Sequence, residues 1–99
     1  MTFAVRYSQD ALEDLERLYD YLLSRDIELA ERAYQAIAKA TEFLESFPFS
    51  CRKASSDNAF LRELVIPFGS SGYVALFEIE DSETVTILAI RHQREEDYH

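Results

Sequence analysis

A cluster of positive side chains near the end of the chain carries the clearest chemical signal in the sequence. Arg91, His92 and Arg94 follow an apolar run from Val85 to Ile90. A strand built from that run would present a positive cluster at the end of a sheet. Because successive strand side chains point to opposite faces, Arg91 and His92 share a pocket only if the strand bends or ends there. One of the two is therefore expected to be structural.

Arg62 is a second conspicuous charge, because it lies inside the apolar run from Leu61 to Ile66. A buried, unpaired guanidinium would destabilise the fold by several kcal/mol, so Arg62 must reach solvent or a carboxylate. Two interpretations follow. Arg62 either pairs across the sheet with Glu78 or another acid, or it is held for a macromolecular target.

RNA cleavage through a ribose 2′-hydroxyl is one chemistry that these residues could support. It needs a base beside that hydroxyl, an acid at the leaving oxygen and cations for the charge on the phosphorane. His92 or Tyr98 could move protons, and Arg62 and Arg91 could hold the phosphate. A lone histidine is, however, more often a satisfied polar group than a catalyst. The alternative is that the same groups contact a protein target.

The overall charge opposes binding that depends on neutralising phosphates. The 99 residues include 19 acidic and 10 basic side chains, which give a formal net charge of -9. Strong nucleic-acid binding relies on clustered Lys and Arg and on a positive field. We therefore expect no strong direct affinity for nucleic acids.

No cofactor or metal is expected. His92 and His99 lack a Cys or carboxylate pattern with metal-ligand spacing, and residues 69–72 are better explained as a hairpin turn than as an anion-binding nest. Cys51 is the single cysteine, which is compatible with a reducing compartment. The N-terminal residues lack the pattern of a signal peptide, and no stretch has the length of a membrane span. These features predict a cytoplasmic location and no membrane partner.

The spacing of apolar residues predicts the strands and helices that position these side chains. Alternation over residues 3–7 predicts a short strand. Ser8 is suited to cap a helix that runs to about Ser24, and Asp26 is suited to cap a second helix that Pro48 ends. The connection of two or three residues makes the two helices an antiparallel hairpin.

The second half of the chain predicts a meander of strands. Residues 49–58 have no sustained period and are expected to be one long loop. Strand-like runs follow at residues 61–68, 73–80 and 84–92, joined by short connectors. The predicted fold is one α+β domain over residues 1–99 with the order β-α-α-β-β-β. Its helical hairpin packs on one face of a small, mostly antiparallel sheet, and we expect function on the face left open.

Five short strings in the chain resemble the RelE/ParE toxin superfamily. Their order and spacing, which close on an Arg-His-Gln-Arg signature, look like ParE and its plasmid-stabilisation relatives. The strings are Val5-Arg6-Tyr7-Ser8, Ala11-Leu12-Glu13-Asp14-Leu15, Leu61-Arg62-Glu63-Leu64, Tyr73-Val74-Ala75-Leu76-Phe77 and Ile90-Arg91-His92-Gln93-Arg94-Glu95.

The resemblance implies the toxin of a bacterial type II toxin-antitoxin pair. Toxins of this superfamily are held inactive by an antitoxin whose tail wraps the toxin. ParE-like members poison DNA gyrase, whereas RelE-like members cleave messenger RNA on the ribosome. We therefore expect a cognate antitoxin from an adjacent gene, bound on the open face or groove by strand addition or as a helix. A homodimer or a toxin-antitoxin hetero-oligomer would be the assembly.

A ParE-like gyrase inhibitor that acts by protein contact is our first hypothesis, because RelE-like nucleases tend to be strongly basic and this chain is acidic. Under the RelE-like alternative, Arg62, Arg91 and His92 would be catalytic. A third possibility is an inactive relative that serves as an antitoxin-binding module. The candidate target-binding residues are Arg62, Arg91, His92, Arg94 and Tyr98.

Overall fold

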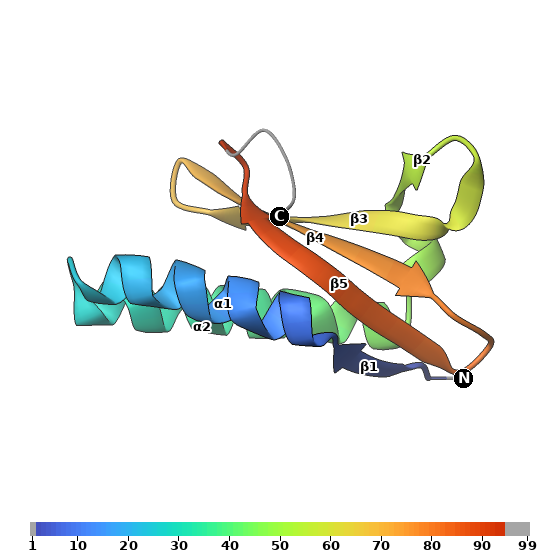
Figure 1. The fold of residues 1–99 in the computed structure, drawn as a ribbon, viewed down its shortest axis with the longest axis horizontal. Coiled ribbons are helices and arrows are strands. Elements are labelled where there is room, and N and C mark those ends of the chain that lie inside the picture. The colour runs from blue at the N-terminus through green and yellow to red at the C-terminus, as the bar shows by residue number, and fades with distance from the viewer. Residues whose placement is uncertain (1, 95–99) are drawn as a thin grey trace.

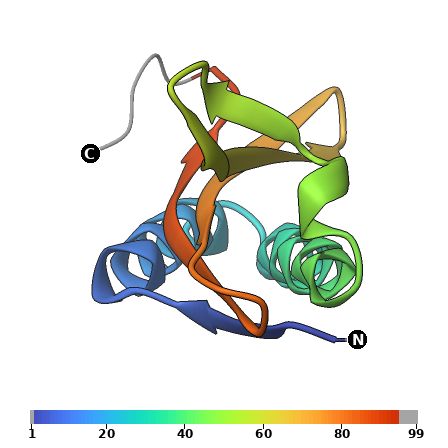
Figure 2. The same ribbon diagram turned by 90° about the vertical axis from the view of Figure 1, so that its right-hand side faces the viewer.

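Two helices lie side by side against one face of a five-stranded sheet in the computed structural model, which describes residues 2–94 (Figure 1). The order of the strands across the sheet is β1-β5-β4-β3-β2. Only β1 and β5 are parallel, so the predicted α+β class and the mostly antiparallel sheet are confirmed. Figure 2 shows the strong twist of the sheet from one end. In chain order the elements are β1 (Ala4–Tyr7), α1 (Gln9–Leu23), α2 (Ile27–Glu42), the 3-10 helices η1 (Phe43–Glu45) and η2 (Pro48–Ser50), β2 (Arg52–Ser55), β3 (Asn58–Phe68), β4 (Ser71–Ile79) and β5 (Thr84–His92).

The predicted loop over residues 49–58 is wrong, because this segment contains most of η2 and the edge strand β2. β2 pairs antiparallel with β3, with Arg52 opposite Glu63 and Lys53 opposite Arg62. Its four residues show no apolar alternation, since a short, charged edge strand is specified by backbone pairing rather than by a buried face. β3 also begins three residues earlier than its apolar run.

Side-chain caps fix the predicted start of both helices. The Ser8 hydroxyl accepts from the Ala11 N–H at 3.1 Å, and the Asp26 carboxylate accepts from two N–H groups of the first turn of α2. Small buried side chains, including Ala30 and Ala33, let the two helices pack closely. Within residues 2–94, no helix has both the length and the apolar character needed to cross a bilayer.

The N-terminal part of α1 protects the outer edge of β5 where no strand covers it. β1 pairs with β5 only as far as Ile87. Beyond that point, the Ser8 hydroxyl donates to the Leu88 carbonyl at 3.1 Å, and the buried Asp14 carboxylate accepts from the Ile90 N–H at 3.0 Å. The N-cap residue Ser8 and Asp14 of α1 therefore satisfy backbone groups that a longer β1 would otherwise pair.

We predict that Asp14→Ala lowers the free energy of unfolding by about 2 kcal/mol, because it leaves the buried Ile90 N–H without an acceptor. Urea denaturation followed by circular dichroism measures the change. Glu16→Ala, on the exposed side of the same helix, is the matched control and should change stability by less than about 0.5 kcal/mol. Equal stability of the two variants would contradict the anchoring role of Asp14.

Candidate functional site

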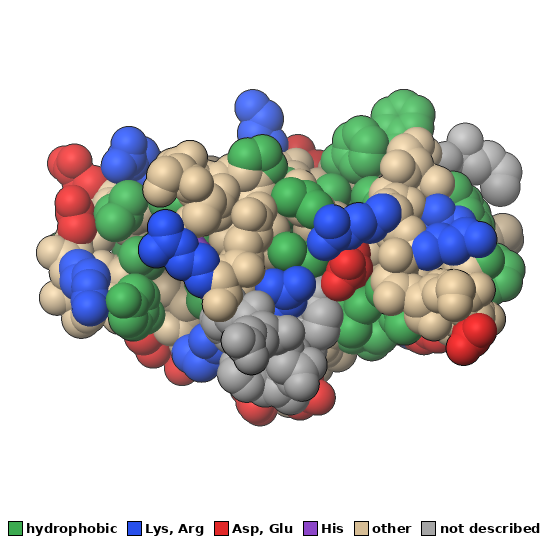
Figure 3. All heavy atoms as spheres, turned by 90° about the horizontal axis from the view of Figure 1, so that it is seen from above, with side chains coloured by type: hydrophobic (Ala, Val, Ile, Leu, Met, Phe, Trp, Pro, Cys, Tyr) green, Lys and Arg blue, Asp and Glu red, His purple; other side chains and the backbone are tan. Residues whose placement is uncertain are grey.

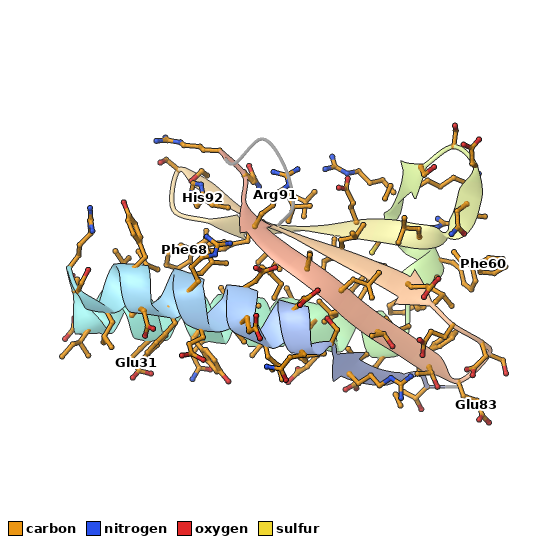
Figure 4. All side chains as sticks on the ribbon, in the orientation of Figure 1. Glu31, Phe60, Phe68, Glu83, Arg91 and His92 are labelled. Atoms are coloured by element: carbon orange, nitrogen blue, oxygen red, sulfur yellow. The ribbon has the colours of Figure 1, made fainter. Side chains whose placement is uncertain are left out.

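A cleft of ≈ 750 Å³ lies between the C-terminal half of α1 and the turn that joins β3 to β4. Apolar and aromatic side chains form much of its wall, and positive groups enter it from both sides. Figure 4 shows Phe68 and His92 near this turn, above α1. The lining residues are Arg17, Leu18, Tyr21, Leu22, Phe68, Gly69, Ser70, Ser71, Tyr73, His92 and Arg94.

The register of the sheet explains why His92 reaches this cleft. His92 lies opposite Tyr73 on β4, and Tyr73 lies opposite Ile66 on β3. Residues opposite one another on neighbouring strands point to the same face, and both Ile66 and Tyr73 are buried beneath the helices. His92 is therefore on the helix-covered face of the sheet.

Hydrogen bonds define the tautomer of neutral His92. Its Nδ1 accepts from the backbone N–H of Arg94 at 3.2 Å, so Nδ1 carries no proton. The proton is then on Nε2, which donates to the Ser71 hydroxyl at 3.1 Å. The ring also packs edge-on against Tyr73, with the ring centroids 5.5 Å apart. Both ring nitrogens thus help to hold the end of β5 against the β3–β4 turn, and Arg94 is placed beside them.

Arg91 lies on the opposite face of the sheet from His92, as the alternation predicted. It is opposite Val74, and its Nη1 lies 3.4 Å from the His92 carbonyl and 3.5 Å from the Gln93 carbonyl. Figure 3 views this open face and shows several Lys and Arg side chains spread along it. Arg91 and His92 therefore do not line one pocket.

Arg62 is separated from both residues along the sheet. It lies opposite Phe77, whereas His92 lies opposite Tyr73, four positions away on β4. At the rise of a β-strand, this offset corresponds to about 13 Å. The structure therefore does not bring Arg62, Arg91 and His92 together.

The guanidinium of Arg62 binds main-chain carbonyls. It donates to Ala59 at 2.7 Å, Cys51 at 2.8 Å and Phe49 at 3.1 Å. The predicted pairing with an acid is wrong: Glu78 lies opposite Leu61, and no carboxylate within residues 2–94 forms an ion pair with Arg62. A sequence-based argument missed this role because the partners are backbone atoms of η2 and its flank.

α1 supplies two residues of the cleft that the sequence analysis did not identify. Arg17 and Tyr21 are one turn apart, and the Arg25 guanidinium lies 4.2 Å from the centroid of the Tyr21 ring. Tyr21 is 59% exposed, so its ring is accessible at the cleft and is not part of the core. The spacing of four residues between Arg17, Tyr21 and Arg25 is the signal that could have revealed a shared helix face. Tyr98 lies outside the described residues.

Comparison with known proteins assigns the class of this chain. The family model described as "ParE toxin of type II toxin-antitoxin system, parDE" matches residues 5–97. The chain is 33% identical over 92 residues to Toxin RelE3 of Caulobacter vibrioides, covering 93% of this chain and 96% of the relative. It is also 33% identical over 96 residues to Toxin RelE1 of the same organism, covering 97% of this chain and 99% of the relative.

Two solved structures share the fold. The chromosomal ParDE toxin-antitoxin system of P. aeruginosa contains a chain with a TM-score of 0.73 and 21% identity, which covers 92% of this chain and 96% of that one. The RelBE2 toxin-antitoxin complex of Mycobacterium tuberculosis gives a TM-score of 0.64 and 20% identity, with coverage of 96% and 95%. The fold is therefore that of the RelE/ParE superfamily. Within this superfamily, the chain belongs to the ParE toxin family of type II toxin-antitoxin systems.

We predict that Arg62→Ala lowers the free energy of unfolding by about 1–2 kcal/mol, because three carbonyls lose a charged donor and η2 loses its tie to β3. Thermal and urea unfolding both report the change. Arg32→Ala, an exposed arginine of α2, is the control and should be nearly neutral. If Arg62→Ala is as stable as Arg32→Ala, the structural role of Arg62 is wrong.

Proposed function

We propose that this toxin inhibits DNA gyrase by protein-protein contact and is neutralised by a cognate antitoxin. The observation that carries the proposal is that Arg62, Arg91 and His92 lie apart. A nuclease that used these three residues would need them around one scissile phosphate. Arg62 is bound to carbonyls at one end of the sheet, and Arg91 lies on the face opposite to His92. Such an arrangement suits binding better than acid-base chemistry.

The cleft beside α1 offers the residue types that dominate protein interfaces. Arg17 and Arg94 bring positive charge, and the half-exposed Tyr21 ring lies between the helix surface and solvent. Arginine and tyrosine are enriched among the residues whose truncation most weakens protein complexes. A target surface with acidic groups around an apolar contact would complement this cleft.

Binding of an antitoxin is supported by the unpaired edge of β3. β2 pairs with β3 only as far as Glu63, so residues 64–68 have a neighbouring strand on one side only. Val65 is 43% exposed in this segment, and Pro67 removes one N–H donor from it. An extended antitoxin segment can add to such an edge through main-chain hydrogen bonds. The net charge of -9 suggests that the antitoxin contributes Lys or Arg.

We predict that the purified toxin blocks supercoiling by purified gyrase, and that Arg94→Ala raises the concentration needed for half inhibition by about tenfold. The reason is the loss of one positive group from the cleft that we assign to the target. Arg32→Ala, which removes an arginine outside the cleft, should inhibit like the wild type. Supercoiling that is unaffected by folded wild-type toxin would contradict the gyrase proposal.

A ribosome-dependent messenger RNA endonuclease is the second candidate, favoured by the RelE names of the two curated relatives. In that case, alanine at Arg91 or His92 would abolish transcript cleavage in a translating extract while the fold stays intact. We expect the wild type to leave transcripts intact. Cleavage of transcripts by the wild type would contradict the gyrase proposal and support the nuclease. Overexpression that is harmless in the absence of antitoxin would instead identify an inactive relative.

A further inference from the structure

A second cleft, of ≈ 780 Å³, opens where β3 and β4 separate at the far end of the sheet from His92. The pairing of these strands stops at Leu61 opposite Glu78. Beyond this pair, Asn58 and Phe60 form one wall with Phe49 of η2, and residues 78–82 form the other. Figure 4 shows Phe60 at this end and His92 at the other end of the sheet. The two clefts are therefore separate surfaces.

All of the charge that lines this second cleft is negative. Glu78, Glu80 and Asp81 contribute carboxylates, and no Lys or Arg of the described residues is in its wall. Glu80 already binds Arg6 at 2.6 Å. The Asp81 carboxylate accepts from the Glu83 N–H at 2.8 Å, and this bond holds the pKa of Asp81 below its ordinary value.

Glu78 is the acid that remains for a ligand. Its carboxylate has no hydrogen-bond or ion-pair partner within residues 2–94. It lies on β4, opposite Leu61 and Thr86, so pairing with strands on both sides fixes its backbone. A negative group held in a partly enclosed, mixed polar and apolar site attracts a cation more strongly than one on an open surface.

Two aromatic rings stand beside these acids and are only half covered by the chain. Phe49 and Phe60 are 51% and 52% exposed, and they meet edge to face with ring centroids 6.1 Å apart. The Arg62 guanidinium already lies 5.4 Å from the centroid of the Phe49 ring, which leaves the exposed Phe60 ring as the aromatic surface for a further cation. An aromatic face next to a carboxylate favours a Lys or Arg side chain, whose aliphatic stem packs on the ring while its head meets the acid.

We propose that this cleft binds a segment of the antitoxin in which a Lys or Arg side chain lies beside an apolar side chain. The positive head pairs with Glu78, and the apolar neighbour covers Phe60. The inference rests on the proposed neutralisation by an antitoxin and names where part of that contact falls on this chain.

Charge complementarity distinguishes the antitoxin segment proposed for the cleft at Phe60 from the target. The cleft beside α1 contains Arg17 and Arg94 and complements an acidic surface, whereas the charged residues of the cleft at Phe60 are all acidic and complement a basic surface. A single small patch on the target cannot be complementary to both clefts. The strongly acidic toxin as a whole also favours a basic antitoxin segment.

The test uses the full-length toxin and, as the probe, the purified protein encoded by the reading frame adjacent to the toxin gene. Titration calorimetry gives the dissociation constant for the wild type, Glu78→Gln and Phe60→Ala. We expect each substitution to raise the dissociation constant by about tenfold or more. Glu78→Gln should also weaken the dependence of binding on salt.

Matched controls separate this effect from a general loss of charge or aromatic area. Glu16→Gln removes an exposed carboxylate of α1, and Phe43→Ala removes a ring that is 45% exposed but lies outside the cleft. Both controls should bind like the wild type. Hydrogen exchange of the wild-type complex provides a readout that needs no variant, and we expect protection at residues 58–60 and 78–82.

The outcomes distinguish the two proposals. If the wild type does not bind the adjacent gene product, the proposed antitoxin partner is overturned and this inference falls with it. If the wild type binds, but Glu78→Gln and Phe60→Ala bind equally well and residues 78–82 gain no protection, the assignment of this cleft is overturned while the antitoxin proposal stands.

Discussion

The hydrogen bond from the Ile90 N–H to the buried Asp14 carboxylate is the constraint on which the cleft beside α1 depends. β1 is too short to pair with the whole of β5, so α1 has to hold the rest of that strand's outer edge. Because His92 and Arg94 follow Ile90 by two and four residues, this bond also fixes these two side chains next to Arg17 and Tyr21 of the same helix. A structural interaction thus sets the geometry of the cleft to which we assign target binding.

The predictable parts of the fold are those that local chemistry specifies. The Ser8 and Asp26 caps and the apolar periodicity predicted both helices. Runs of residues that favour strands predicted β3, β4 and β5. β2 was missed because an edge strand of Arg, Lys, Ala and Ser has no buried face to produce a pattern. The sequence also did not reveal that Asp14 is buried, since its partner is a backbone N–H 76 residues away.

The candidate site was predictable only in part, for a similar reason. The positive end of β5 was visible, and alternation correctly separated Arg91 from His92. Arg62 binds backbone carbonyl groups, which every residue type has. The residue types in the sequence therefore could not predict this role. The contribution of α1 to the cleft was hidden because Arg17 and Tyr21 approach the end of β5 only in the folded chain.

The two clefts divide the surface of this small domain by charge. Positive and aromatic groups gather where α1 meets the end of β5, and acids with two phenylalanines gather where β3 leaves β4. If the target binds the positive cleft and the antitoxin binds the acidic one, as we propose, the opposite charges of the two clefts would disfavour binding of either partner at the other's site.

Site-specific photo-crosslinking in bacteria can identify the macromolecule that binds in the cleft beside α1. A photoreactive phenylalanine analogue at Tyr21, which is exposed in the cleft beside α1, would capture the macromolecule bound there. Our account predicts a covalent adduct with a gyrase subunit, identified by mass spectrometry, and none when the analogue replaces Phe43 outside the cleft. Adducts formed only with ribosomal components would contradict it.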